Sequence, residues 1–201
     1  MTEEHLANQR IWHRYIAADG TWRRKDGGVA TQRPPGEDLA VLRQGLSRPA
    51  GTVLEMFRFY TCPVDDFAAR RGEVSAEQEA EHIALALYGL HQQSQDRPMH
   101  RDGVGLGRAM LALRRHDHTS DEAVDSRFQQ AFSATSTSAL QLRLRGLVTQ
   151  LKDIKQPLDY NRLISDIHHW HRPEPRSRVR RRWGLDYNDW TSQPTAPRTD
   201  S

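Results

Sequence analysis

The sequence contains very little cysteine and no long hydrophobic run. Its 201 residues include one cysteine, Cys62, which excludes both a disulfide within the chain and a zinc site built from several cysteines. No stretch approaches the roughly 20 apolar residues of a membrane-spanning helix. The first residues are acidic, at Glu3 and Glu4, where a signal peptide is basic. We therefore expect a cytoplasmic protein with no membrane partner.

Lysine is also scarce, because 26 of the 29 basic residues are arginine. Residues 1–96 hold 11 basic and 14 acidic residues, whereas residues 97–201 hold 18 and 12, so the two parts carry about −3 and +6. Arginine binds phosphate in a bidentate manner that lysine cannot match. A GC-rich genome produces the same preference for arginine with no function attached. The positions of the arginines must decide between these explanations.

Strand patterns are nearly absent, and apolar residues repeat at helical spacing along most of the chain. The clearest helix begins near Ser138, and its apolar face consists of Leu140, Leu144, Leu147, Val148, Leu151 and Ile154. Ser75 with Gln78 and Thr119 with Glu122 form capping boxes that mark helix N-termini. Asp159 can cap another helix, and further helices are expected at 11–16, 38–46, 52–60, 106–113 and 175–183.

This pattern predicts an all-α fold of about eight to nine helices packed as two small helical bundles. We expect an N-terminal bundle over residues 1–118, with a basic loop at 19–36, and a C-terminal bundle over residues 119–190. Residues 191–201 are rich in Ser, Thr and Pro, which favours a disordered tail. Three tryptophans lie on apolar faces and are expected in the core: Trp12, Trp170 and Trp183.

The sequence offers no catalytic set, and we expect neither an enzyme nor a cofactor. The histidines that invite a metal hypothesis are His116, His118, His168, His169 and His171. His168 and His171 are three residues apart, a spacing that suits two ligands on a helix. No carboxylate or cysteine pattern completes a recognised ligand set, so we expect no metal site.

Glycine is concentrated at Gly103, Gly105 and Gly107, a pattern that superficially resembles a phosphate-binding loop. A dinucleotide fingerprint needs a preceding strand, and a Walker motif needs a lysine; both are missing. We therefore expect no nucleotide and no small-molecule substrate. The glycines either let the backbone approach a phosphate ahead of a helix N-terminus or form a flexible connection between helices.

Arginines surround this loop and continue through the second half of the chain. Arg143 and Arg145 lie off the leucine face of the long helix and are expected to face solvent. The other positions are Arg97, Arg101, Arg108, Arg114, Arg115, Arg127 and a run from 176 to 182 that is almost unrelieved by acid. Basic helical surfaces of this kind suit backbone phosphates. They do not suit reading of bases, because no single helix carries a recognition set. Solvated or salt-bridged charge is the ordinary alternative for any one arginine.

Several blocks of sequence, taken in order, resemble a known family. They are Asp38-Leu-Ala-Val-Leu-Arg43, Met56–Tyr60, Gly105-Leu-Gly107-Arg108-Ala109-Met110, Arg127-Phe128, Leu140-Gln-Leu-Arg143-Leu144, Pro157-Leu158-Asp159-Tyr160 with Leu163, Asp166 and Trp170, and Val179–Trp183 with Asp186-Tyr187. In their order and spacing, the chain resembles the small subunit of the type I-E CRISPR Cascade complex, the CasB family.

This resemblance implies a non-catalytic, two-part helical protein within a larger complex. Family members sit as a pair and contact the backbone and large subunits of Cascade, beside the guide RNA and the target DNA. Their basic surfaces guide the target and displaced strands and stabilise the R-loop. Carried over by matching position, the phosphate contacts are Arg43, Arg108, Arg127, Arg143 and Arg145. Arg101 and Arg114 follow from their place beside the glycine loop.

Two other functions remain open from the residues alone. A sequence-specific regulator of helix-turn-helix type would need a helix pair with a polar recognition helix, which residues 104–132 imitate loosely. A helical adaptor would use its arginines on acidic protein surfaces, with no nucleic-acid contact.

Overall fold

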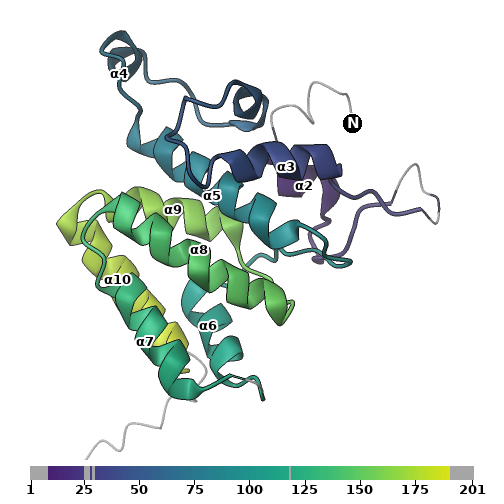
Figure 1. Cartoon of the computed structure of the whole chain (residues 1–201), viewed down its shortest axis with the longest axis vertical. Helices are drawn as coiled ribbons and strands as arrows, with labels where there is room; N and C mark the ends of the chain where they lie inside the picture. Colours follow the sequence, from purple (N-terminus) through teal and green to yellow (C-terminus); the bar gives the residue numbers. More distant parts are fainter. Residues whose placement is uncertain (1–8, 25–27, 29, 118, 191–201) are drawn as a thin grey trace, which may run out of the picture.

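The computed structural model describes residues 9–24, 28, 30–117 and 119–190, and these residues confirm the all-α prediction. Nine α-helices and one 3-10 helix occur within these ranges (Figure 1). They are α2 (Ile11–Tyr15), α3 (Gly36–Gln44), the 3-10 helix η1 (Leu54–Phe59), α4 (Asp66–Arg70), α5 (Ala76–Gln92), α6 (Leu106–Arg114), α7 (Asp121–Phe132), α8 (Thr137–Asp153), α9 (Tyr160–Trp170) and α10 (Pro173–Tyr187). His118 and the predicted tail at 191–201 lie outside the described residues.

Two of the predicted N-caps are confirmed and one is wrong. Ser75 accepts a hydrogen bond from the Gln78 backbone N–H (3.1 Å), and Asp159 accepts one from that of Arg162 (2.9 Å). α7 is capped by Ser120, which accepts from the Ala123 N–H, and not by Thr119. The Thr119 hydroxyl instead donates to the carbonyl oxygens of Leu113 in α6 and of His116 just after it, because the turn between the two helices folds back on α6.

The last helix is longer than predicted. α10 begins at Pro173, a residue type favoured in the first helical turn, and continues through Gly184 to Tyr187. Asp186 and Tyr187 are both buried, and this tertiary burial outweighs the low helix propensity of glycine. The short helix α4 was not predicted; Asp65 caps it by accepting from two backbone N–H groups.

The core forms around α5, which is buried on all sides from Ala80 to Gly89. α3, α8 and α9 pack against α5, while α6 packs against α7, α8 and α10. Trp12, Trp170 and Trp183 are fully buried, as predicted, and the last two stack with ring centroids 5.1 Å apart.

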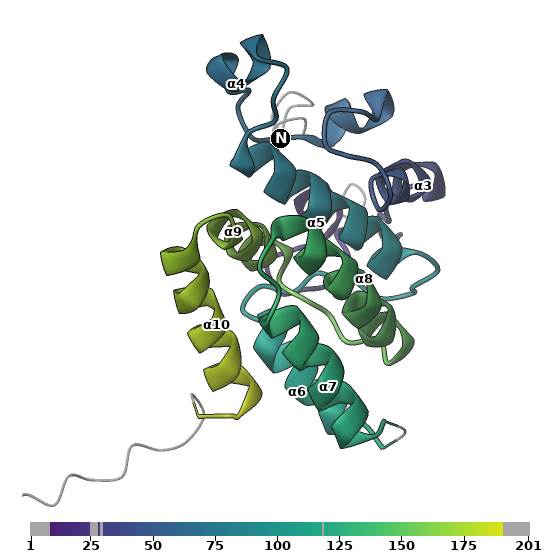
Figure 2. The same ribbon diagram turned by 60° about the vertical axis from the view of Figure 1, so that its left-hand side comes forward.

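One apolar cluster runs from Ile11 in α2 to Tyr187 in α10. The division of the chain at residues 118–119 stays a prediction. Both views place α4 at the opposite end of the molecule from α6 and α7 (Figures 1 and 2). Among the described residues, no helix has the length and apolarity to cross a membrane.

Candidate nucleic-acid interface

Five of the seven predicted site arginines are exposed, and a sixth is half-buried. Arg43 is half-buried, and the exposed members are Arg101, Arg108, Arg127, Arg143 and Arg145. None of these six forms an ion pair with another described residue. Their guanidinium groups are therefore available to an external anion.

Arg114 differs from the other six because its charge is used within the protein. Its Nε lies 3.2 Å from an oxygen of Asp125 and 3.4 Å from one of Asp121, both on α7. Its guanidinium also lies over the ring of Tyr187 in α10, 5.8 Å from the centroid. Arg114 thus joins α6 to α7 and α10, and we place it last among the candidate phosphate contacts.

Three of the candidates, Arg43, Arg143 and Arg145, lie on helices that pack against α5. α8 runs parallel to α5, because their first turns meet where Thr137 Oγ1 donates to Glu79 Oε1 (2.9 Å). The last turn of α8 meets the segment that directly follows α5, where Gln95 Nε2 donates to the Lys152 carbonyl oxygen (3.4 Å). α8 therefore follows α5 along its whole length (Figure 1).

α3 crosses the same stretch of α5 in the opposite direction. Its last turn meets His82, since a Cβ at Gly45 would lie 2.8 Å from the His82 ring. Its middle meets Gly89, where an added Cβ would lie 2.7 Å from Leu42 Cβ. Gly89 is therefore the position that lets α3 pack closely on α5.

These two arrangements bring Arg43 and Arg145 to a shared edge. Gln141 Nε2 on α8 donates to the Gly45 carbonyl oxygen at the end of α3 (3.4 Å). Arg145 lies one helical turn beyond Gln141 on the same side of α8. Arg43 lies two residues before Gly45, and its backbone N is 3.2 Å from the Cβ position of Gly89. Both arginines thus lie beside the contact that Gln141 of α8 makes with the end of α3.

A third arginine at this edge, Arg48, was missed in the sequence. Its carbonyl oxygen accepts a hydrogen bond from His82 Nε2 (2.9 Å), and its exposed guanidinium contacts Gln44 without an ion pair. A spacing of five residues from Arg43 does not point to a shared helical face, so only the turn after α3 brings the two together. We call Arg43, Arg48 and Arg145 the α3–α8 seam.

The remaining candidates lie apart from the seam. Arg108 on α6, Arg127 on α7 and Arg143 on α8 project from three helices that pack against one another. Arg101 lies in the connection between α5 and α6, where its Cγ is 3.6 Å from the Cβ position of Gly20. The predicted residues therefore do not all converge on one spot.

The basic run in α10 has mainly internal partners, in contrast to its acid-free appearance in the sequence. Arg182 pairs with the buried carboxylate of Asp166 in α9. Arg180 donates to the Ala134 carbonyl oxygen (2.8 Å) and lies over the Trp170 ring. Arg178 pairs with Glu174 (2.8 Å) on the surface. Most of this run therefore stabilises the packing of α10.

The glycine loop allows close packing of helices. A Cβ at Gly105 would lie 2.9 Å from Arg162 Nη1, and one at Gly107 would collide with the Trp183 carbonyl oxygen. The N–H of Gly103, which has a φ of +80°, donates to Asp159 Oδ2 (2.8 Å). These glycines let the start of α6 approach α9 and α10.

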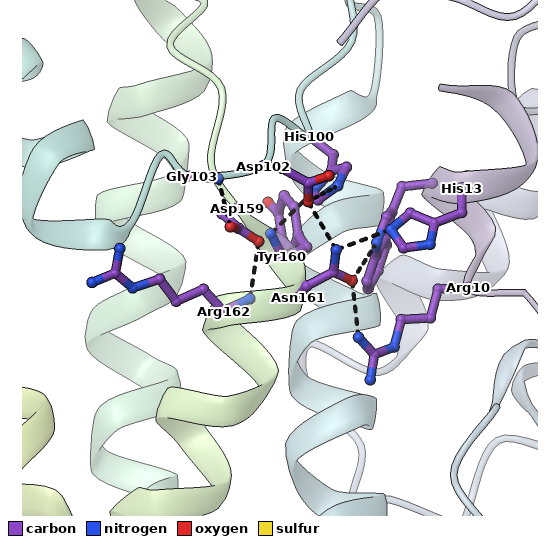
Figure 3. Close-up of polar contacts among 10 residues, drawn as sticks. Arg10, His13, His100, Asp102, Gly103, Asp159, Tyr160, Asn161 and Arg162 are labelled. Carbon is purple, nitrogen blue, oxygen red and sulfur yellow. Dashed lines mark hydrogen bonds and ion pairs between the residues drawn. The ribbon is translucent and has the colours of Figure 1, made fainter. Parts of the chain in front are cut away.

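A polar network at the other side of the loop ties the N-terminal segment to α9 (Figure 3). Asn161 accepts hydrogen bonds at Oδ1 from Arg10 Nη1 (2.9 Å) and from Trp12 Nε1 (3.0 Å). Its Nδ2 therefore faces His13 Nε2 (2.9 Å) and Asp102 Oδ1 (3.0 Å) as the donor to both. The orientation of the amide is determined by these four partners.

His13, His100 and Asp102 bring ligand atoms within 4.8 Å of one another, a geometry that could hold a metal ion. The His100 tautomer opposes this. Its Nδ1 accepts from the Tyr160 backbone N–H (3.1 Å), so the neutral ring carries its proton on Nε2, which faces Asp102 Oδ1 at 3.2 Å. A metal-bound histidine needs the reverse arrangement, with a proton on its other nitrogen that it donates.

Burial also holds both rings of this network in the neutral form. Desolvation lowers the pKa of His100 to about 4, against the opposing effect of the Asp102 carboxylate. Desolvation lowers the pKa of His13 as well. The predicted metal candidates His168 and His171 are engaged elsewhere, with Glu77 (3.0 Å) and Glu79 (3.5 Å). The His13–His100 network is best understood as a structural connection.

Comparison with known proteins gives one family and two solved structures. The family model described as CRISPR-associated protein Cse2 matches residues 38–187. CasB from Thermobifida fusca is 35% identical, with a TM-score of 0.60, and the match covers 76% of this chain and 84% of that one. CasB from M. ruber, at 22% identity, shares the fold with a TM-score of 0.57 over 80% and 89% of the two chains. A comparison with the curated proteins gave no match.

Proposed function

Because the chain belongs to the Cse2 (CasB) family of type I-E Cascade subunits, we propose that it is the non-catalytic small subunit, which binds the target and displaced DNA strands and stabilises the R-loop. It acts in antiviral defence, in the cytoplasm. Its proposed partners are the Cascade backbone and large subunits, a second copy of itself, the guide RNA and the target DNA.

The observation that carries this proposal is the α3–α8 seam. Arg43, Arg48 and Arg145 form no ion pair with another described residue. The carboxylate that lines the hollow beside Arg48 belongs to Glu79, which accepts a hydrogen bond from Thr137 and pairs with His171. Three arginines without a matching acid favour an anionic ligand with spaced charges, such as a nucleic-acid backbone.

The chemistry of such contacts suits an R-loop. Exchange of a DNA duplex for a guide–target heteroduplex is close to balanced, so contacts to the backbone can tip it. Guanidinium groups on helices bind phosphates whatever the base sequence. A subunit that works with any guide RNA needs this sequence independence.

Strand binding measured across a range of salt concentrations tests the proposal. The double variant Arg43→Ala/Arg145→Ala is compared with Arg58→Ala/Arg178→Ala, which removes two exposed arginines already paired with Asp38 and Glu174. The seam variant is expected to bind DNA more weakly for every sequence, with a salt slope shallower by about 1 for each lost contact. The control variant is expected to keep the slope of the unmodified protein.

Two outcomes would favour the other functions. An unchanged slope in the seam variant would indicate a helical adaptor without nucleic-acid contacts. Tight binding to one duplex sequence, with a large loss on base changes, would indicate a sequence-specific regulator.

A further inference from the structure

Large apolar side chains are exposed mainly at one end of the molecule. Among the described residues seven are exposed, and five of them lie between residues 54 and 74: Leu54 (80%), Phe57 (50%), Val64 (69%), Phe67 (71%) and Val74 (41%). We call these five residues the α4 surface. Figures 1 and 2 show α4 standing away from the packed helices. Clustered exposure of this kind marks an interaction site more often than scattered single residues do.

The α4 surface is held in place by the core beneath it. In η1, Met56 and Phe59 point inward and are fully buried, which leaves Leu54 and Phe57 on the outside. Val74 Cγ2 lies 3.7 Å from the Cβ position of Gly51, so the segment before α5 packs beside the turn before η1. Val74 therefore lies beside the segment that leads into η1.

A buried carboxylate anchors the connection between η1 and α4. Glu81 in α5 is 1% exposed and accepts from the backbone N–H groups of Thr61 and Cys62, both at 2.9 Å. The Thr61 hydroxyl donates to the same carboxylate. This arrangement orders the backbone before binding, which reduces the entropy cost of docking.

The charges beside the α4 surface disfavour a nucleic acid. Arg58 pairs with Asp38 (2.6 Å), and Arg71 pairs with Glu73 (2.6 Å). Residues 54–74 hold four acidic and three basic residues, and one of the basic residues, Arg58, pairs with Asp38 outside this range. Outside these two ion pairs, Glu55, Asp65 and Asp66 outnumber Arg70, so the net charge is acidic, the opposite sign to the α3–α8 seam.

We propose that the α4 surface docks another protein subunit of the same complex, whose matching surface is an apolar recess with a basic rim. Phe57 and Phe67 act as the anchors, since buried aromatic side chains contribute most of the energy at protein interfaces. Glu55 and Asp66, both exposed, face the basic rim. This inference rests on the proposed function, because it assumes that the chain works inside the assembled complex.

A second copy of the chain fits this surface poorly. The remaining exposed large apolar residues of the described chain are Leu142 and Trp190, which lie far from one another in sequence and form no comparable cluster. A contact between two α4 surfaces would place Glu55 and Asp66 against acidic residues of the same kind. Such like-charge contacts are unfavourable at an interface.

The test uses the complex assembled from the other Cascade proteins and guide RNA, prepared without this chain. Fluorescently labelled full-length chain is titrated into it. Val64→Ser/Phe67→Ser is expected to raise the Kd at least tenfold, whereas the control Leu142→Ser, at a position that is 64% exposed elsewhere, stays within twofold. Thermal unfolding should be unchanged in both, because the altered side chains are exposed.

The charge of the rim is tested separately with Glu55→Lys. This variant is expected to weaken docking at low salt and to approach the unmodified protein at high salt, where charge is screened. A Kd within twofold for Val64→Ser/Phe67→Ser overturns the docking proposal. So does a defect confined to self-association of the isolated chain in sedimentation equilibrium.

Failure of this inference can be told apart from failure of the proposed function. Arg43→Ala/Arg145→Ala should enter the complex normally but bind DNA strands more weakly. Val64→Ser/Phe67→Ser, added at saturating concentration, should restore strand binding once incorporated. Normal assembly of both variants overturns only the docking surface, and unaltered strand binding by the arginine variant overturns only the proposed function.

Discussion

Asn161 faces His13 with its amide nitrogen, 2.9 Å from Nε2, and cannot turn over because its oxygen accepts from Arg10 and Trp12. The neutral His13 ring therefore accepts at Nε2. A proton on that nitrogen would place two donors against each other. Asp102 and Asp159 favour the charged ring, whereas desolvation, Arg10 and Arg23 oppose it and lower the pKa of His13.

Acidification is therefore expected to weaken the attachment of α2. The pKa values of His13 and His100 lie below the unfolded value of 6.5, so the unfolded chain binds more protons. Their stabilisation is complete above pH 6.5 and is lost as the pH falls below it. For His100 the loss extends to its folded pKa of about 4 and is on the order of 3 kcal/mol.

Thermal unfolding between pH 7.5 and 4.5 measures this effect. His13→Asn/His100→Asn should have a flatter dependence of Tm on pH than the unmodified protein. The double variant is compared with the unmodified protein because Asp166 gives a pH dependence of the opposite sign. Burial raises the pKa of Asp166 to about 6, so its contribution to the stability of the protein is lost as the pH rises through this range. Parallel curves for the double variant and the unmodified protein would contradict the prediction.

Two mid-helix glycines should respond oppositely to alanine. At Gly89 a Cβ would meet Leu42 Cβ at 2.7 Å and the Leu39 carbonyl oxygen at 3.0 Å, so Gly89→Ala is expected to lower the free energy of unfolding by about 1–3 kcal/mol. At Gly146 nothing lies within 4 Å, and alanine should stabilise α8 by about 0.5–1 kcal/mol. Urea denaturation of both variants measures these changes. Equal changes in the free energy of unfolding would argue against close packing of α3 on α5.

The buried carboxylate of Asp166 is expected to be essential for the packing of α9 on α10. It accepts from Trp183 Nε1 (2.6 Å) and pairs with Arg182. Asp166→Ala leaves both donors without a partner, and a loss of about 3–5 kcal/mol is expected. Glu174→Ala, which breaks an exposed pair with Arg178, should change stability by less than about 1 kcal/mol. Similar losses for the two variants, measured by urea denaturation, would refute this role.

Substitution of two neighbouring arginines on α10, Arg180 and Arg181, should affect the stability of the protein differently. Arg180 donates to the Ala134 carbonyl oxygen and covers the Trp170 ring, so Arg180→Ala is expected to cost about 1–2 kcal/mol. Arg181 is exposed, and Arg181→Ala should leave the Tm unchanged. Calorimetry on the two variants provides the measurement. An equal fall in Tm for both variants would show that Arg180 does not stabilise the protein through its contacts with Ala134 and Trp170.

Local sequence patterns predicted most helices because helix formation depends on nearby residues. Ser75 and Asp159 each bond a backbone N–H three residues ahead, so their capping role is visible in the sequence. Thr119 has the same pattern and was wrongly assigned, because its hydroxyl donates to the carbonyl oxygens of Leu113 in α6 and of His116 just after that helix. The end of α10 was also misplaced, since burial of Tyr187 outweighs Gly184.

The candidate site was only partly predictable. The exposure of Arg143 and Arg145 follows from their angle to the leucine face of α8. No such rule could show that Arg114 meets Asp121 and Asp125. Arg48 was missed because its place at the seam depends on the turn after α3.

By itself, the sequence determined that this protein is helical, which faces of its helices are apolar, and where several helices begin. These properties depend on residues within one or two turns of each other. Only the tertiary structure decided which arginines are free, that the glycine loop packs against α9 and α10, and that acidic and apolar groups gather at α4. Charge pairing and exposure depend on residues that are distant in the chain, and packing alone brings them together.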